Sequence, residues 1–222
     1  FLFFMKKHSK GYNTRTKILT EARKLLNEKG LGLTLDSLSL EMGLSRGRIT
    51  NYFRTKDSLL LGIMRSYEHA LGTLLLQNEE DDKPGFLPQY RILSKIMDVQ
   101  YEYRCAIAYL SVSGRHQPEV HLHVESSFLN RLESIRMRLS AMVAMELLIP
   151  DLLKQPHLDM YCFQYTTLLT TWVICQEMYY SKRGFEKMKP IYLKSIMNLY
   201  IPYLTEKGKI AFELLDQPDK AN

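Results

Sequence analysis

The sequence predicts an all-α fold, because apolar residues recur at intervals of three and four over most of its 222 residues. No stretch shows the regular alternation of apolar and polar residues that marks a half-buried strand. We find no internal repeat and no low-complexity tract. Hydrophobic residues make up 45% of the chain and charged residues 24%, a balance that supports a sizeable core without a disulfide framework.

The N-terminal region contains a succession of short helices with clear end signals. The first predicted helix covers residues 14–29, and Gly30 follows it where a C-terminal cap is expected. A second helix begins after Thr34, a favourable N-cap, and stops at Gly43. Ser45, which comes shortly afterwards, is a suitable N-cap for a third helix. Two short helices joined by a glycine-containing turn predict a helix-turn-helix.

The remainder of the chain is also predicted to be helical. A fourth helix starts near Lys56, and the acidic stretch 78–85 ends its pattern with a proline and a glycine. Further helices are predicted over residues 88–113, 120–148, 158–181 and 189–199, with a continuation after Pro202. We therefore expect about nine helices in total. The predicted parts are a flexible arm (1–12), a helix-turn-helix domain (13–56) and a larger helical regulatory domain (57–222).

Basic residues are concentrated at the N-terminal end. Residues 1–60 contain 12 Lys and Arg against 5 Asp and Glu, whereas residues 61–222 contain 18 against 19. A cationic block of this kind suits a polyanionic partner such as nucleic acid. A solvated basic face would give the same count, so charge alone does not decide between the two interpretations.

The third predicted helix separates apolar from polar side chains. On a helical wheel of residues 46–54, Ile49 and Phe53 fall on one side, where they can pack on the first two helices. The other side carries Gly47, Arg48 and Asn51, flanked by Tyr52 and Arg54. Glycine lets a backbone approach a duplex closely, and arginine and asparagine match the paired hydrogen-bonding groups of guanine and adenine. We therefore predict that Arg48 and Asn51 read bases in a major groove.

Other polar residues of this region are placed to bind phosphate groups, which position a protein on DNA without specifying sequence. Thr34 and Ser45 lie at helix N-termini, Tyr52 lies beside the reading face, and Lys56 begins the fourth helix. Each also has a structural interpretation, since caps, packed tyrosines and solvated lysines occur without DNA. Their joint occurrence within a helix-turn-helix favours the DNA-binding interpretation.

Three segments of the N-terminal region carry a family resemblance. They are Lys17–Gly30, which begins KIL and ends EKG, the turn GLSRG from Gly43 to Gly47, and YFRTK from Tyr52 to Lys56. With these segments, residues 14–60 resemble the DNA-binding region of the TetR family of bacterial transcriptional regulators. The resemblance covers about a fifth of the chain.

This resemblance implies an all-helical homodimer. Its first three helices would bind operator DNA, and its larger C-terminal domain would dimerise and bind a small-molecule inducer. The contact positions that it implies are Thr34, Arg46, Gly47, Arg48, Thr50, Asn51, Tyr52 and Lys56. Thr50 stands where the family commonly has tyrosine and Tyr52 where it commonly has histidine, so contacts at these two positions are expected to differ in detail.

Dimerisation also follows from DNA geometry, because two reading helices about 34 Å apart discriminate more base pairs than one. The helices predicted over residues 158–181 and 190–201 are candidates to pair across a two-fold axis. The predicted interface residues are Leu168, Leu169, Trp172, Val173, Cys175, Ile191, Leu193, Ile196, Met197 and Tyr200. The alternative is that both helices lie in the interior.

The C-terminal region is rich in aromatic residues, as a mostly apolar ligand pocket would be. The candidate ligand contacts are Tyr101, Tyr109, Phe128, Phe163 and Trp172. Aromatic residues at helical spacing also fill ordinary cores, so each of these has a structural alternative.

Histidines and cysteines of the same region give weaker signals. A group near Glu119 consists of His116, His121 and His123. It lacks the i, i+4 spacing of a helical metal pair, and we expect no metal site. Cys162 and Cys175 lie in apolar surroundings typical of inert thiols rather than of a redox switch.

The leading hypothesis is a DNA-binding transcriptional regulator, most simply a repressor released from a palindromic operator by a largely apolar ligand. An activator would use the same residues. The competing class is an enzyme or small-molecule carrier with an incidental basic N-terminus. The chain has no glycine-rich phosphate loop, nucleophile elbow, HExxH or paired-carboxylate motif, so we expect no catalysis and no cofactor.

The cellular location is predicted from three features that proteins outside the cytoplasm often have: disulfide bonds, a signal peptide and a membrane span. Its three cysteines are too scattered for a disulfide framework. The opening Phe1–Phe4 precedes a basic stretch, the reverse of a signal peptide, and Met5 is a candidate start of the natural chain. No apolar run approaches the length of a membrane span. We expect a cytoplasmic protein without a membrane anchor.

Overall fold

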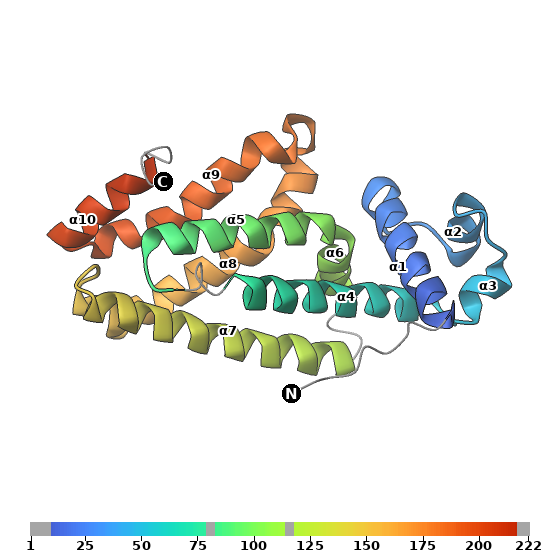
Figure 1. Ribbon diagram of the computed structural model, residues 1–222, viewed down its shortest axis with the longest axis horizontal. Helices are drawn as coiled ribbons and strands as arrows, with labels where there is room; N and C mark the ends of the chain where they lie inside the picture. Colours follow the sequence, from blue (N-terminus) through green and yellow to red (C-terminus); the bar gives the residue numbers. More distant parts are fainter. Residues whose placement is uncertain (1–9, 79–82, 114–117, 217–222) are drawn as a thin grey trace. The chain divides into compact units, whose positions relative to one another are not determined.

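The computed structural model describes residues 10–78, 83–113 and 118–216 (Figure 1). These residues contain ten α-helices, four short 3-10 segments and no β-strand, which confirms the predicted all-α class. The α-helices are α1 (Lys10–Lys29), α2 (Leu35–Glu41), α3 (Arg46–Thr50), α4 (Lys56–Gln77), α5 (Phe86–Glu102), α6 (Arg104–Ser113), α7 (Pro118–Ala144), α8 (His157–Tyr179), α9 (Phe185–Met197) and α10 (Glu206–Glu213). The 3-10 segments are Pro150–Leu153, Ser181–Arg183, Asn198–Tyr203 and Leu214–Asp216. No described helix is both long and apolar enough to cross a membrane.

One more α-helix is present than expected, because the helix predicted over residues 88–113 is interrupted at Tyr103. The cause is a tertiary contact. The amide of Cys105, in the first turn of α6, donates to Asn27 Oδ1 at 3.0 Å and so has a partner outside its own helix. The amide of Ala106 then donates to the Tyr103 carbonyl at 2.9 Å, which starts the new helix.

Contacts between residues divide the chain into two compact units. Among the described residues, unit 1 comprises 10–69 and 102–112, and unit 2 comprises 70–78, 83–101, 113 and 118–216. Unit 1 is larger than the predicted helix-turn-helix domain of residues 13–56. That this segment binds DNA stays a prediction.

The core of unit 1 is built by helices from two distant parts of the sequence. Its buried apolar residues are Ile18, Leu19, Ala22, Leu26, Leu35, Leu38, Ile49, Phe53, Leu59, Leu60, Ile63, Met64, Cys105, Ala106 and Tyr109. The Tyr109 hydroxyl also donates to the Asp57 carboxylate at 3.1 Å. Residues of α6 therefore complete a core that the first four helices begin.

The turn between α2 and α3 depends on Gly43. Its φ of +62° lies in the left-handed region, which glycine adopts without the strain of a Cβ atom. The amides of Gly43 and Leu44 donate back to carbonyl groups of α2 at 3.1 and 2.9 Å, which closes the turn. The predicted N-caps are confirmed, since the Thr34 and Ser45 hydroxyl oxygens accept backbone amides at the starts of α2 and α3.

Helix α3 is shorter than the helical wheel assumed, because it ends at Thr50 instead of continuing to residue 54. The reason is the cap of α4, which begins at Lys56 as predicted. Thr55 and Ser58 cap each other, with each side-chain oxygen accepting the other residue's amide at 3.1 Å. Few residues remain for α3 before this cap. The two apolar residues of the wheel are nevertheless buried, as predicted.

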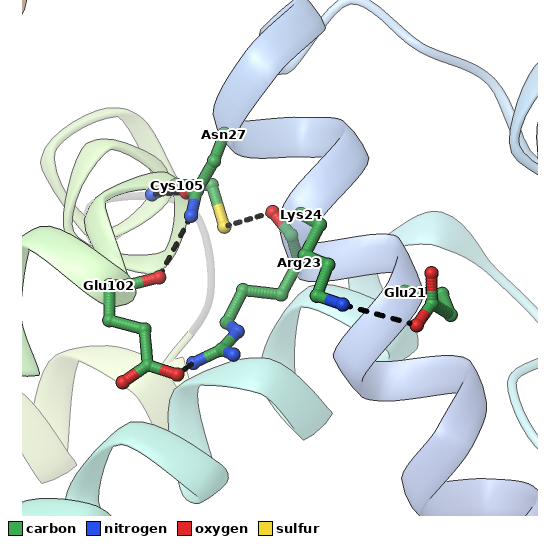
Figure 2. A network of polar contacts seen from close by, with 6 residues as sticks. All are labelled: Glu21, Arg23, Lys24, Asn27, Glu102 and Cys105. Atoms are coloured by element: carbon green, nitrogen blue, oxygen red, sulfur yellow. Dashed lines mark hydrogen bonds and ion pairs between the residues drawn. The ribbon is translucent and has the colours of Figure 1, made fainter.

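A polar network within unit 1 joins α1 to the junction between α5 and α6 (Figure 2). Asn27 lies at its centre, with Nδ2 donating to the Glu102 carbonyl at 2.8 Å and Oδ1 accepting the Cys105 amide. The Arg23 guanidinium forms an ion pair with the Glu102 carboxylate and lies 4.3 Å from the centre of the Tyr103 ring. The side chain of Asn27 thus satisfies both a carbonyl at the end of α5 and an amide at the start of α6.

Replacing Asn27 with alanine is expected to lower the free energy of unfolding by about 1 to 3 kcal/mol, because a backbone donor and a backbone acceptor lose their partner. Urea unfolding of the full chain measures the change. Asn13→Ala is a matched control, since Asn13 is exposed on the same helix. Equal midpoints for the two variants would show that Asn27 does not hold the junction.

Cys105 is buried, and its thiol donates to the Arg23 carbonyl at 3.8 Å. Burial raises the pKa of this thiol from its ordinary 9.0 to about 11. Alkylation requires the thiolate, so iodoacetamide at pH 8 is expected to label Cys105 only on unfolding, whereas the half-exposed Cys175 reacts in the folded protein. Mass spectrometry of labelled peptides measures both rates, and comparable rates in the folded chain would contradict the assignment.

The raised pKa of Cys105 also has a consequence for stability. Folding favours the protonated thiol, so its stabilising contribution is complete below pH 9 and is lost as the pH rises towards 11. The wild-type chain is therefore expected to lose stability over this range faster than Cys105→Ala. Parallel unfolding curves at each pH would show that the thiol does not titrate as described.

The core of unit 2 combines stacked aromatic rings with paired amides. The ring of Phe185 stacks with those of Tyr101 and Trp172, with ring centres 4.2 and 5.3 Å apart. The Trp172 Nε1–H group donates to Gln100 Oε1 at 2.7 Å, and Gln100 Nε2 donates to the Leu169 carbonyl at 3.1 Å. Each polar group named here is therefore satisfied although it is buried.

Backbone hydrogen bonds join the C-terminal part of unit 2 to the residues that follow α7. Leu148 and Leu204 form an isolated antiparallel bridge. The Thr205 amide donates to the Leu147 carbonyl at 3.2 Å, and the Thr205 hydroxyl accepts the Gly208 amide at 2.9 Å as the N-cap of α10. This arrangement fixes where α10 begins.

Candidate nucleic-acid interface

The predicted DNA-contact residues lie on the start of α2, on α3 and on the turn into α4, all within unit 1. Seven of them are exposed: Thr34, Ser45, Arg46, Gly47, Arg48, Asn51 and Tyr52. Thr50 and Lys56 are half-buried. Figure 1 shows α2 and α3 next to each other at one end of the ribbon of unit 1. The elements that carry most of these residues are therefore neighbours, and seven of the nine residues are accessible.

The two predicted base-reading side chains are free to bond outside the chain. Arg48 and Asn51 are both exposed. Neither side chain forms a hydrogen bond or an ion pair with any residue that the structure describes. Asn51 lies at the C-terminal cap of α3, directly after its last helical residue. The core beneath α3 holds the backbone in place, while these two side chains keep their full set of donors and acceptors.

Gly47 is not required by the packing of unit 1. A Cβ atom at this position would meet no other atom within 4 Å. Glycine in a helix is less favourable than alanine by about 1 kcal/mol. Local stability therefore does not explain its presence, and its exposed position leaves the α3 backbone open to approach from outside.

Arg46 differs from Arg48 because it already has a partner. Its guanidinium lies 3.1 Å from the carboxylate of Asp36 on α2, and both side chains are 63% exposed. Exposed ion pairs of this kind contribute about 0 to 1 kcal/mol, so Arg46 can exchange Asp36 for a phosphate at little cost. Asp36 was not predicted as part of this surface, because the pairing depends on how α2 and α3 pack.

The remaining candidates have structural bonds as well as exposed groups. The hydroxyls of Thr34 and Ser45 accept backbone amides as caps. The Thr34 hydroxyl also forms a hydrogen bond of 3.0 Å with the Ser37 hydroxyl, in which either oxygen can be the donor, whereas the Ser45 hydroxyl hydrogen is left able to donate. Thr50 Oγ1 donates to the Gly47 carbonyl at 3.2 Å. Lys56 Nζ donates to the Leu31 carbonyl, so one of its three ammonium hydrogens is engaged.

A family of known proteins matches the segment that contains this helix-turn-helix. Residues 18–63 match the family model for bacterial regulatory proteins of the tetR family. The N-terminal region of the chain is therefore similar to the TetR family over these residues. No curated protein matches the sequence.

Solved structures extend the TetR-family likeness to the fold of the whole chain. A TetR-family transcriptional regulator from Marinobacter aquaeolei VT8 aligns with a TM-score of 0.75 at 20% identity, over 92% of this chain and 98% of that one. The regulator PfmR from Thermus thermophilus aligns with a TM-score of 0.60 at 17% identity, over 83% and 97%. The SmeT–triclosan complex aligns with a TM-score of 0.56 at 13% identity, over 87% and 93%. The chain thus has the fold of a TetR-family transcriptional regulator.

The five candidate ligand residues of this TetR-like chain lie in different environments. Tyr101 and Trp172 stack in the core of unit 2, and Tyr109 lies in the core of unit 1. Phe128 and Phe163 instead line a groove between α7 and α8, with 43% and 71% of their surfaces exposed. We call this depression the α7–α8 groove. The regular spacing of threonines on α8 was the sequence signal that could have located it.

Most of the predicted dimer-interface residues are buried within the chain itself, which corrects that assignment. They are Leu169, Trp172, Val173, Leu193, Ile196, Met197 and Tyr200. The apolar face of each helix fills the core of unit 2 and is not available to a second copy. Of the predicted set, Ile191 is exposed and Leu168 and Cys175 are half-buried.

Metal binding has no support in the described part of the chain, where no group of three or more His, Cys, Asp or Glu side chains could hold an ion. The candidate group of Glu119 and the three neighbouring histidines lies outside the residues whose side chains are described.

Proposed function

We propose that the chain is a dimeric transcriptional regulator that binds a palindromic operator, and most simply a repressor released by a small molecule. The observation that carries this proposal is the state of Arg48 and Asn51. Both are exposed on a helix-turn-helix, and neither is used by the described part of the fold. Such side chains suit guanine and adenine edges in a major groove.

Phosphate contacts are proposed for the groups around this reading pair. The hydroxyls of Thr34 and Ser45, the Arg46 guanidinium, the Tyr52 hydroxyl and the Lys56 ammonium would position α3 on the duplex. Thr50 and Gly47 complete the proposed contact surface. The proposed DNA-binding domain is the segment 13–56, and 57–222 is the proposed regulatory domain.

A homodimer is proposed through α8 and α9, with Ile191 kept from the residues that the sequence indicated and with Met178 and Tyr179 added. Met178, Tyr179 and Ile191 expose 66%, 70% and 52% of their surfaces on these two helices. Burial of such side chains against a second copy is favourable by about 25 cal/mol per Å² of apolar surface. A two-fold dimer would present two α3 helices to an inverted repeat.

Small-molecule control is proposed by analogy. The SmeT structure is a complex with triclosan. A ligand that binds better to the state with low DNA affinity would shift the population towards that state and release the operator.

The experiment is in vitro selection of random duplex DNA by the full chain at a fixed moderate salt concentration. Recovery of an inverted repeat is the expected result. Electrophoretic titration of that repeat at two salt concentrations then measures affinity and the number of phosphate contacts. Recovery of no preferred sequence would count against the proposal.

A further inference from the structure

The α7–α8 groove has the dimensions of a small-molecule site. Its volume is about 420 Å³, within the range of roughly 300 to 1,000 Å³ typical of ligand pockets. Phe128, Leu132 and Arg136 line it from α7. They are spaced at intervals of four along one helix face and so extend over about 12 Å.

Part of the groove lining is apolar. Phe128 and Leu132 line it from α7, and Phe163 lines it from α8. Phe128 and Phe163 expose 43% and 71% of their surfaces in the isolated chain. Covering such surface with an apolar ligand is favourable by about 25 cal/mol per Å².

The threonines of α8 form a wall that offers few hydrogen-bond donors. The hydroxyl of Thr166 donates to the Cys162 carbonyl, that of Thr170 to the Thr166 carbonyl and that of Thr171 to the Thr167 carbonyl, each at 2.7 Å. A hydroxyl has one hydrogen, so these three residues present methyl groups and oxygen lone pairs to the groove. This wall favours an apolar chain or ring system over a ligand rich in acceptors.

The groove lining also carries a cation that has no hydrogen-bond or ion-pair partner among the described residues. Arg136 is exposed and forms no ion pair or hydrogen bond with any described residue. Asp159 also lines the groove, but its carboxylate accepts a hydrogen bond from Gln155 Nε2 at 2.9 Å and forms no ion pair with Arg136. A guanidinium without a partner is suited to bidentate binding of a carboxylate.

We propose that the α7–α8 groove binds an amphipathic carboxylate, with its apolar part along Phe128, Leu132 and Phe163 and its carboxylate on Arg136. This assigns a chemical class to the ligand of the regulator proposed above, and its regulatory meaning rests on that function. Binding to the groove itself does not depend on DNA.

The test is calorimetric titration of the full chain, without DNA, with three ligands of equal chain length: decanoate, decan-1-ol and decylammonium. Decanoate is expected to bind at least tenfold more tightly than the other two. Arg136→Gln should weaken decanoate about tenfold or more and leave decan-1-ol unchanged. Asp159→Asn should strengthen decanoate several-fold, because it removes a like charge.

Two further variants separate the groove from general effects. Arg91→Gln makes the same change at an exposed arginine of α5 outside the groove and should alter no affinity. Phe163→Ala should weaken decanoate and decan-1-ol by similar factors, since it removes apolar contact. Equal binding of decanoate and decan-1-ol, no binding of either, or an unchanged affinity in Arg136→Gln would overturn the proposal. A preference for decylammonium that Asp159→Asn abolishes would also overturn it.

The outcome is independent of the DNA-binding proposal. Tight decanoate binding together with a failed DNA selection would keep the site and reject the regulator. A successful selection with no decanoate binding would keep the regulator and reject the carboxylate site. If both hold, decanoate should lower operator affinity of the wild-type chain and not that of Arg136→Gln.

Discussion

Replacement of both Arg48 and Asn51 with alanine is expected to remove most of the sequence preference of the chain. A good bidentate contact discriminates by about 1 to 3 kcal/mol, so the pair should account for roughly 2 to 6 kcal/mol at the selected site. Affinity for random duplex should change little, because phosphate contacts dominate there. Titration of the selected repeat and of a random duplex at the same salt concentration measures both quantities.

The expected effect on folding is small, since neither side chain bonds to a described residue of the chain. Thermal unfolding of the double variant should therefore match that of the wild type. Arg65→Ala is a suitable control, because Arg65 is exposed on α4 outside the proposed contact surface. Equal losses on the selected repeat and on random DNA would assign Arg48 and Asn51 to phosphate binding instead of base reading.

Helix ends in unit 1 were predictable because their signals are local. Thr34, Ser45 and Gly43 act within a few residues of their own positions, and the structure places all three as predicted. The break at Tyr103 was not predictable in this way. Its cause is Asn27, a residue 78 positions before Cys105 whose side chain accepts that amide. Apolar spacing carries no information about such a cap.

In the candidate interface too, local features were predictable from the sequence and contacts between elements were not. Arg48 and Asn51 could be named from side-chain chemistry and the pattern of one helix. The ion pair of Arg46 with Asp36 and the bond of Lys56 to the Leu31 carbonyl depend on packing between elements. The predicted dimer residues on α8 and α9 were mostly wrong for a related reason, since an apolar stripe does not reveal whether it faces its own core or a second copy.

Gly208→Ala is expected to lower the free energy of unfolding by about 3 kcal/mol or more, the upper end of what overpacking produces. A Cβ atom at this position would lie 2.0 Å from the Leu147 carbonyl oxygen and 3.0 Å from its carbon. That carbonyl cannot move freely, because it accepts the Thr205 amide at 3.2 Å. Displacing α10 instead would strain the Thr205 cap, which bonds the Gly208 amide.

Thermal unfolding separates this steric effect from the general behaviour of glycine in helices. Gly72→Ala is the matched control, because Gly72 lies on α4 and an added Cβ atom there meets nothing within 4 Å. This substitution should stabilise the chain by up to about 1 kcal/mol. With a chain of this length, Gly208→Ala should lower Tm by roughly 6 to 12 °C. The two substitutions add the same methyl group to a helix, so their opposite signs would show that contact with the Leu147 carbonyl decides the result. A Tm for Gly208→Ala at or above that of the wild type would mean that α10 shifts away from Leu147 at little cost and is only loosely held by its cap.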